Sequence, residues 1–180
     1  MDKNIEKEFK ILVNKEQFYE LKKDYDPLEF ETQINIYFDN EEHVIEKKKG
    51  AMRIRSKNNI HIFTLKMHRQ DGLHEYECEV EGNDVSNLNK DEILMLLDEY
   101  GIYGPFYPTA TLKTERAVFE SEMAELCFDI NFYNNVIDYE IEYEFKKEHD
   151  GFTLFNSLLS KVDLVYEENC KSKIQRALRK

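Results

Sequence analysis

The segment from Ile5 to Val13 alternates charged and apolar side chains, and its charged members could bind both a cation and an anion. In a β-strand, Glu6, Glu8 and Lys10 would point to one side, and the apolar row that ends at Val13 would point to the other. Two carboxylates suit a hard divalent cation, and an ammonium group suits an anionic oxygen. A metal-bound polyphosphate needs both. The alternative is an edge strand whose charged side faces only solvent.

Later segments show the same alternation, and each gathers charges of one sign on one side. Arg53 and Arg55 share a face in the segment 51–56, and Lys66 lies on the charged side of the segment 60–68. Two further segments carry long acidic rows without interspersed lysine. These rows are Glu75, Glu77, Glu79 and Glu81, and Asp138, Glu140, Glu142 and Glu144.

Apolar periodicity and turn residues predict the elements that position these side chains. Asn14 can cap a helix, with Gln17 three residues later in a capping box, and Pro27 ends the apolar stripe that follows. Asn58-Asn59 and Asp71-Gly72 predict hairpin turns. We expect strands over residues 5–13, 28–39, 51–56, 60–68, 74–81, 109–119, 124–133 and 136–145, and helices after Asn14, over 84–100 and over 153–164.

Eight strands with three or four helices predict a largely antiparallel α+β fold. At 180 residues we expect one domain, residues 1–180, that includes a C-terminal helical segment at about 150–180. If the sheet closes into a barrel with helices against its apolar outer side, the charged faces line the interior. A charged interior of both signs is costly unless every charge has a partner. A triphosphate with a divalent metal would supply those partners; the alternative is an open sheet with one solvated face.

Composition excludes several classes of protein. The formal net charge of −12, from 37 acidic and 25 basic residues, argues against general nucleic-acid binding through the phosphate backbone. Cys78, Cys127 and Cys170 are odd in number and form no CxxC pair, so neither a disulfide framework nor a zinc site is expected. A cytoplasmic location fits the reduced thiols. The sequence also shows no signal peptide and no apolar run long enough for a membrane span.

Taken in order, these motifs resemble those of the CYTH superfamily, the triphosphate tunnel metalloenzymes, and most of all its small stand-alone bacterial members. The residues Glu6-Lys7-Glu8-Phe9-Lys10 fit the family's N-terminal ExExK motif. One ExExK is a weak signal, but the match runs through nearly the whole chain. The other matching motifs are Arg53-Ile54-Arg55, Thr64-Leu65-Lys66, Glu75-Tyr76-Glu77-Cys78-Glu79, Thr114-Glu115-Arg116, Glu140-Ile141-Glu142 and Ser172-Lys173-Ile174.

The resemblance implies an eight-stranded antiparallel closed β-barrel, the triphosphate tunnel, with helices packed outside. It implies an enzyme that hydrolyses triphosphates, such as inorganic tripolyphosphate, thiamine triphosphate or a nucleotide, with Mg²⁺ or Mn²⁺. A small-molecule triphosphate is then the expected partner, and the protein is expected to be a monomer or a homodimer. The expected phosphate ligands are Lys10, Arg53, Arg55, Lys66, Arg116 and Lys173, and the expected metal ligands are Glu6, Glu8, Glu77, Glu79, Glu140 and Glu142. The expected catalytic group consists of Glu6, Glu8, Lys10 and Lys66.

The basic strand departs from the family pattern. Many members have Lys-x-Arg on the basic strand, whereas Lys113 and Arg116 are three residues apart here. Either a bulge restores their common face, or only Arg116 lines the interior. Lys173 could instead be a lysine at the C-terminal end of a helix, where it would favour the helix dipole. The histidines His61, His68 and His74 are expected to be surface or hairpin residues.

Two other functions stay open from the sequence. One is a class IV-type adenylate cyclase; that branch has a His-Phe pair ahead of ExExK, and this sequence starts too late to hold one. The other is a non-catalytic module that binds polyphosphate or a nucleotide. Product analysis on ATP separates the first from a triphosphatase, and tight binding without turnover identifies the second.

Overall fold

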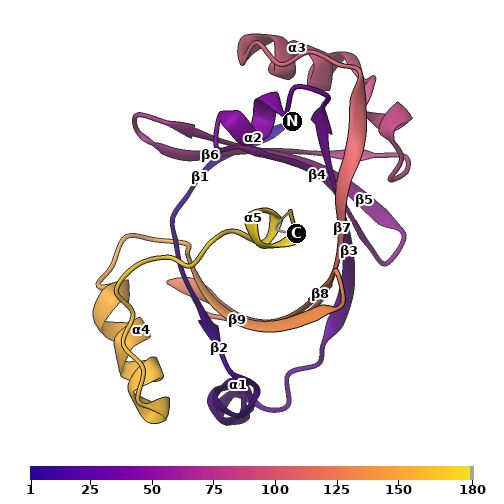
Figure 1. The fold of residues 1–180 in the computed structure, drawn as a ribbon. Coiled ribbons are helices and arrows are strands. Elements are labelled where there is room, and N and C mark those ends of the chain that lie inside the picture. The colour runs from indigo at the N-terminus through magenta and orange to yellow at the C-terminus, as the bar shows by residue number, and fades with distance from the viewer. Residues whose placement is uncertain (179–180) are drawn as a thin grey trace. The chain divides into compact units, whose positions relative to one another are not determined.

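The structure, a computed structural model, describes residues 1–178 and contains nine strands and five α-helices within that range (Figure 1). The strands are β1 (Asp2–Glu6), β2 (Glu8–Val13), β3 (Glu31–Asn40), β4 (Ala51–Lys57), β5 (Ile60–Arg69), β6 (Gly72–Val80), β7 (Phe106–Glu120), β8 (Ala124–Tyr133) and β9 (Val136–Phe145). The helices are α1 (Lys15–Lys22), α2 (Val44–Lys47), α3 (Asp91–Glu99), α4 (Gly151–Leu159) and α5 (Lys173–Ala177). Short 3₁₀ turns lie at Lys23–Tyr25, Val85–Leu88 and Ser160–Val162.

The strands follow the order β1-β6-β5-β4-β3-β7-β8-β9-β2, so both ends of the order belong to one N-terminal segment. The antiparallel α+β class is confirmed, with nine strands in the described range where eight were expected. The additional strand arises because the segment 2–13 divides at Lys7. The part before Lys7 pairs with β6, and the part after it pairs with β9.

The described chain divides into two compact units. Unit 1 comprises Met1–Glu6, Gln33–Leu112 and the described residues from Lys173 onward, and unit 2 comprises Lys7–Thr32 and Lys113–Ser172. Each unit has its own apolar core. The long strand β7 contributes to both units, because the division falls after Leu112.

In unit 1, α2 and α3 cover one face of the sheet, and α5 lies on the other side (Figure 1). The covered face is apolar, because side chains alternate along each strand and Ile54, Phe63 and Leu65 point toward the helices. Leu96 and Leu97 of α3 complete this core. The opposite side of the same strands is therefore free to carry charge; we call it the charged face of unit 1.

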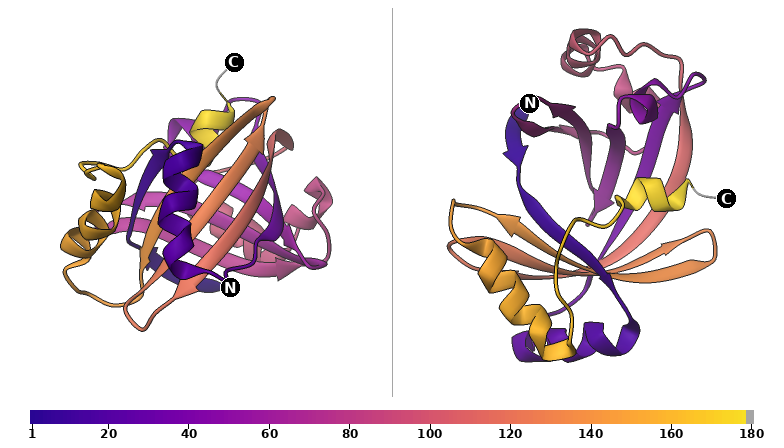
Figure 2. Two further views of the ribbon diagram at one scale, coloured as in Figure 1. Left: turned by 90° about the horizontal axis from the view of Figure 1, so that it is seen from below. Right: turned by 60° about the vertical axis from the view of Figure 1, so that its left-hand side comes forward.

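In unit 2, α1 and α4 pack against the apolar side of β8, β9 and β2, and Figure 2 shows α1 lying across these strands. Asn14 caps α1 as expected, since its Oδ1 accepts a hydrogen bond from the Gln17 N–H at 2.8 Å and the Gln17 side chain accepts from the Asn14 N–H at 3.0 Å. Phe18 of α1 is fully buried against Phe128. The other side of this sheet is the charged face of unit 2.

The expected turns are confirmed, while the boundaries of some elements differ. Asn58 and Asn59 both have positive φ, 51° and 63°, as a tight hairpin turn requires. The helix expected over 84–100 begins only at Asp91, because Asp84 caps a short 3₁₀ turn instead. No described helix has the length and apolar character needed to cross a membrane.

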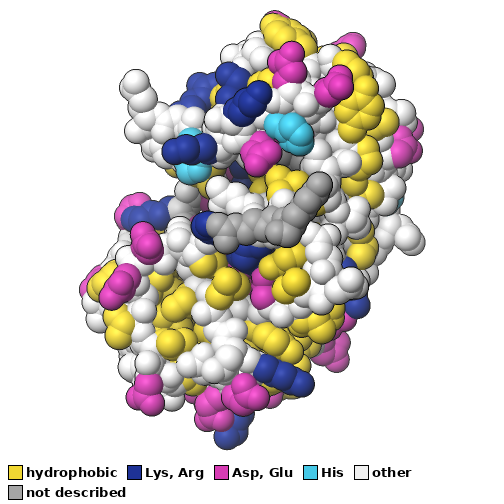
Figure 3. Space-filling model, in the orientation of Figure 1, with side chains coloured by type: hydrophobic (Ala, Val, Ile, Leu, Met, Phe, Trp, Pro, Cys, Tyr) yellow, Lys and Arg dark blue, Asp and Glu magenta, His cyan; other side chains and the backbone are white. Residues whose placement is uncertain are grey.

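Burial on α3 predicts unequal costs for two substitutions on one helix. Leu97 is 1% exposed, whereas Met95 is 70% exposed, and hydrophobic side chains are visible on the surface around α3 in Figure 3. Leu97→Ala should lower the free energy of unfolding by about 2–5 kcal/mol, because it leaves a cavity in the core of unit 1. Met95→Ala should change it by less than about 0.5 kcal/mol. Urea titrations of both variants check this, and equal losses would contradict the assigned burial.

Candidate functional site

The charged face of unit 1 is built by the register of five strands. Residues that pair directly across neighbouring strands share a face, so Tyr37, Arg53, Thr64, Glu77 and Asp2 form one row. The neighbouring rows add the remaining polar side chains of this face. They are Asn4, Asn35, Arg55, Lys66, Glu75 and Glu79. Basic residues on β4 and β5 thus lie beside the carboxylates of β6.

Arg53 has the most unusual environment on this face. Arg53 is only 8% exposed, and its buried Nε has no hydrogen-bond partner among the described residues. Burial by itself would lower the pKa of Arg53, but the Tyr37 hydroxyl and the Glu75 and Glu77 carboxylates raise it above its ordinary value. The guanidinium therefore stays charged and keeps one N–H donor for which no described residue supplies an acceptor.

Neighbouring polar groups on the same face have protein partners. Arg55 donates from Nε to Asn35 Oδ1 at 3.2 Å, and Thr64 donates to Glu77 Oε1 at 2.8 Å. Lys66 Nζ lies 2.7 Å from Glu6 Oε1 and 3.1 Å from Glu75 Oε1. Lys66 therefore reduces the repulsion between two of the carboxylates.

The charged face of unit 2 is dominated by carboxylates. The register of β2, β9, β8 and the end of β7 places Lys10 beside Glu142, and Arg116 beside Asp129. The other polar residues of this face are mostly acidic. They are Glu8, Glu125, Asn131, Asp138, Glu140 and Glu144, together with Thr114. The predicted pair Glu140 and Glu142 is buried here, at 0% and 5% exposure.

Arg116 is the main counter-charge of this acidic face. It donates from Nε and Nη2 to the two oxygens of Asp129, at 2.8 and 2.7 Å, and it also contacts Glu142 and Glu144. Burial alone would lower the pKa of Arg116, but the carboxylates of Asp129 and Glu142 hold it well above its usual range. Arg116 therefore orders three carboxylates before any ligand binds.

Lys10 supplies the second positive charge. Its Nζ donates to Glu8, and although burial lowers its pKa, the Glu8, Glu142 and Glu140 carboxylates raise it above the ordinary value. Lys10 thus remains an ammonium group across the physiological range. Both cations together leave the face with a surplus of carboxylate oxygens, which is the donor set that Mg²⁺ and Mn²⁺ prefer.

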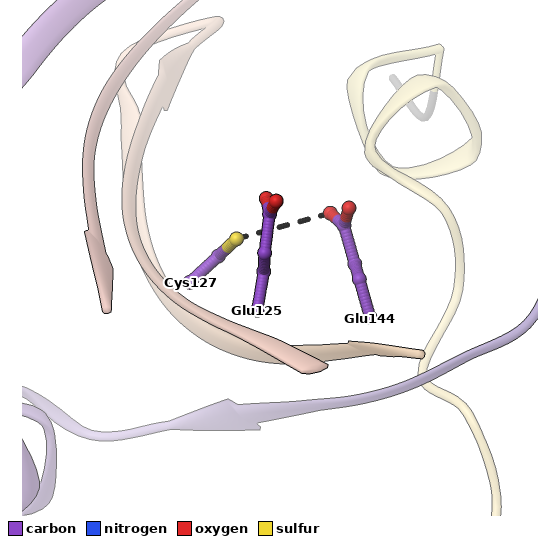
Figure 4. Close-up of side chains that lie close together, drawn as sticks. All are labelled: Glu125, Cys127 and Glu144. Carbon is purple, nitrogen blue, oxygen red and sulfur yellow. Dashed lines mark hydrogen bonds between the residues drawn. The ribbon is translucent and has the colours of Figure 1, made fainter. Parts of the chain in front are cut away.

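Part of that surplus converges on one place. Ligand atoms of Glu125, Cys127 and Glu144 all lie within 4.8 Å of one another (Figure 4). Burial, helped by the carboxylates of Glu144 and Glu142, raises the pKa of the Cys127 thiol, so the sulfur stays protonated and donates to Glu144 Oε1 at 3.8 Å. The carboxylates fit a hard cation there, whereas a protonated thiol does not coordinate one.

The structure decides three questions that the sequence left open. β7 and β8 pair without a bulge from Lys113 to Glu120, so alternation places Lys113 on the apolar side, over the Phe132 ring, and Arg116 on the charged face. Lys173 is the first residue of α5, so its interpretation as a lysine at the C-terminal end of a helix is wrong. His74 is a hairpin residue as expected, since it pairs with Met67 in the β5–β6 hairpin, but it is not on the surface, because it is 3% exposed and its Nε2 lies 2.7 Å from Asp71 Oδ1.

The predicted site residues therefore fall into two groups. Unit 1 holds Glu6, Arg53, Arg55, Lys66, Glu77, Glu79 and Lys173; unit 2 holds Glu8, Lys10, Arg116, Glu140 and Glu142. The site residues expected from the sequence motifs do not include Glu125, Asp129 and Glu144, which the structure places on the charged face of unit 2. The alternation of Glu125, Cys127, Asp129 and Asn131 with Leu126, Phe128 and Ile130 was the signal that could have found the first two.

A family model and a protein relative match nearly the whole of this chain. The family model of the CYTH domain matches residues 4–178. The Bacillus subtilis protein YjbK, described as a proposed triphosphatase, is 32% identical, and the match covers 98% of this chain and 95% of YjbK.

Two solved structures are similar along nearly their whole length. A Bacillus halodurans protein described as a proposed adenylate cyclase shares 32% identity with a TM-score of 0.87, covering 98% of both chains. A Hippeastrum protein, described as a proposed adenylyl cyclase with a dominant triphosphatase activity, shares 25% identity with a TM-score of 0.78, covering 95% of this chain and 94% of that one.

The contacts of Arg116 predict a stability effect that separates it from Lys113 on the same strand. Arg116→Met removes the guanidinium that pairs with the fully buried Asp129 and should lower the free energy of unfolding by about 3–5 kcal/mol. Lys113→Met removes a partly exposed pair with Glu115 and the contact of the ammonium group with the Phe132 ring, and it should cost less than about 1 kcal/mol. Urea unfolding measures both. A small effect of Arg116→Met would remove its assigned role as counter-charge.

Proposed function

The chain belongs to the CYTH domain family, and on that premise we propose that it is a divalent-metal-dependent triphosphatase. The observation that carries the proposal is Arg53. It presents a buried N–H without an acceptor among the described residues, on the same face as Arg55. Guanidinium groups bind phosphate oxygens through two parallel hydrogen bonds, so an anionic phosphate is the partner this donor fits best.

The proposed phosphate ligands are the cations of the charged faces, namely Arg53, Arg55, Lys66, Lys10 and Arg116, with Lys173 from α5. These cations differ in whether a carboxylate of the protein already contacts them. Arg116 and Lys66 already contact carboxylates, so their role is shared between those carboxylates and a phosphate. Arg53 is proposed as the principal phosphate contact, because its buried Nε has no hydrogen-bond partner among the described residues. Arg55 is proposed beside it because the register places both side chains on one face.

The proposed metal ligands are carboxylates. Glu8, Glu140 and Glu142 are retained from the sequence, together with Glu6, Glu77 and Glu79, and the structure adds Glu125 and Glu144 as candidates. When bound, Mg²⁺ or Mn²⁺ would neutralise phosphate oxygens and acidify a coordinated water. The protein residues hold the phosphate chain in position, keep the carboxylates ordered through Arg116 and Lys66, and offer a glutamate oxygen that can accept the proton of the attacking water.

Hydrolysis of a phosphoanhydride suits such a site, because it depends on positioning and charge neutralisation more than on covalent catalysis. A cyclase would also need to hold the ribose and base of ATP. The Phe and Tyr side chains mostly pack in the two apolar cores, and Tyr37, which lies on a charged face, is only 3% exposed. We therefore favour hydrolysis of the phosphate chain, in a cytoplasmic protein with free thiols.

The acidic face of unit 2 predicts that turnover depends on added divalent metal. Glu8→Gln keeps the size of the side chain and removes its charge, so it should abolish activity while the thermal midpoint stays close to that of the wild type. Glu148→Gln is the control, because Glu148 is exposed and pairs only with Lys7 among the described side chains. Activity of both is measured with and without chelator. Full activity of the wild type in excess chelator, or of Glu8→Gln with metal, would contradict the assignment.

The shortage of base-reading groups predicts the order of substrates. The specificity constant for inorganic tripolyphosphate should equal or exceed that for ATP, since binding energy is concentrated on the phosphate chain. Pyrophosphate should be poor because it is too short to engage both the cations and the metal ligands. The test compares tripolyphosphate, ATP, GTP, thiamine triphosphate and pyrophosphate under one metal condition, with analysis of the products. Cyclic AMP as the main product from ATP would favour the cyclase, and tight binding without turnover would favour a binding module.

A further inference from the structure

The strand that carries Glu8 and Lys10 has a free edge within unit 2. β2 pairs with β9 on one side, where the Phe145 N–H donates to the Lys7 carbonyl at 2.9 Å. In an antiparallel pair, alternate residues direct their backbone groups toward and away from the partner strand. The backbone groups of Glu8 and Lys10 therefore point away from β9, and the sheet of unit 2 supplies no strand to receive them.

A segment from far along the chain satisfies these groups. The Lys10 N–H donates to Asn169 Oδ1 at 2.8 Å, and Asn169 Nδ2 donates to the Glu8 carbonyl at 3.1 Å. The Cys170 N–H donates to the Lys10 carbonyl at 3.1 Å. A carboxamide has the same donor and acceptor as a peptide group, so the Asn169 side chain occupies the place of a strand residue at this edge.

The segment is itself fixed in unit 2. The Tyr166 ring packs on Phe9, with centroids 4.7 Å apart, and its hydroxyl donates to Asn169 Oδ1 at 2.9 Å. The Tyr166 N–H donates to Asn156 Oδ1 of α4 at 2.7 Å. Asn169 is itself exposed, but the hydroxyl of the buried Tyr166 ties its side chain to the apolar core of unit 2.

We propose that Asn169 is a positioning residue for the metal-binding carboxylate of Glu8 and the ammonium of Lys10, an inference that rests on the proposed function. It clamps the peptide groups on both sides of Phe9, between the two functional side chains. Because Glu8 and Lys10 project from this backbone onto the charged face, a shift of the strand edge displaces both groups together. Asn169 touches neither substrate nor metal and acts only through β2.

The role of Asn169 predicts a specific combination of effects. In Asn169→Ala, the Lys10 amide should exchange with solvent faster than in the wild type, and Mn²⁺ affinity should fall about 10-fold, the scale for losing an outer-shell support. The Mn²⁺ concentration that gives half-maximal tripolyphosphate hydrolysis should rise with it, while the thermal midpoint changes little. Asn169→Ser removes the same carboxamide and should reproduce the effects if the alanine variant folds poorly.

Asn156→Ala is the matched control, because its carboxamide contacts neither Glu8 nor Lys10, and the Phe9, Phe152 and Phe155 rings still hold Tyr166 when it is removed. Its Mn²⁺ affinity should stay near that of the wild type. Equal losses in both variants, or unchanged Mn²⁺ affinity in Asn169→Ala with a faster Lys10 amide, would overturn the inference. A wild-type protein that binds Mn²⁺ without hydrolysing any triphosphate would refute the proposed function alone, and the Mn²⁺ affinities of the variants would still decide the role of Asn169.

Discussion

Crowding of like charge is the constraint on which the site depends. Glu8, Glu140, Glu142 and Glu144 project from two paired strands, and Asp129 and Glu125 project from the next. Carboxylates at such spacing repel one another and are costly to bury. The structure relieves this with Arg116 and Lys10, which are too few to neutralise the face. The remaining negative charge is what makes the face receptive to a divalent cation, so its electrostatic cost and its proposed function have the same origin.

The apolar core of each unit offsets the electrostatic cost of its charged face. Most strands that carry charge on one side bury apolar side chains on the other, where α2 and α3 cover unit 1 and α1 and α4 cover unit 2. Burial of these side chains supplies the stabilisation, at about 25 cal/mol for each Å² of apolar surface removed from water. The apolar cores thus supply most of the stabilisation, while on the charged face of unit 2 the buried pair of Arg116 and Asp129 serves both the fold and the arrangement of the carboxylates.

The sequence predicted the faces well, because the strand period of two residues directly reveals which side chains point together. Arg53 and Arg55, or Glu140 and Glu142, share a face in any register. The sequence does not reveal which strands pair. The pairing of Arg116 with Asp129 and the opposite orientation of Lys113 therefore became visible only from the register of β7 and β8. The division of the first strand at Lys7 was hidden for the same reason, since both halves continue one alternation. Asn169 gave no periodic signal at all, because its role comes from a contact across 159 positions of sequence.

The division at Lys7 also has a consequence for how the protein is made. Asp2 pairs with Glu77 and Glu8 pairs with Glu144, so neither half of the N-terminal segment has a neighbour nearby in the chain. During synthesis the N-terminal segment can form its backbone hydrogen bonds to β6 and β9 only after those strands have been made. Pairings between residues so far apart in sequence slow folding. An unpaired strand is an aggregation hazard, and closely spaced charges are a common protection against it. The glutamates and lysines of this segment, which include residues proposed for the site, would thus also protect the nascent chain from aggregation.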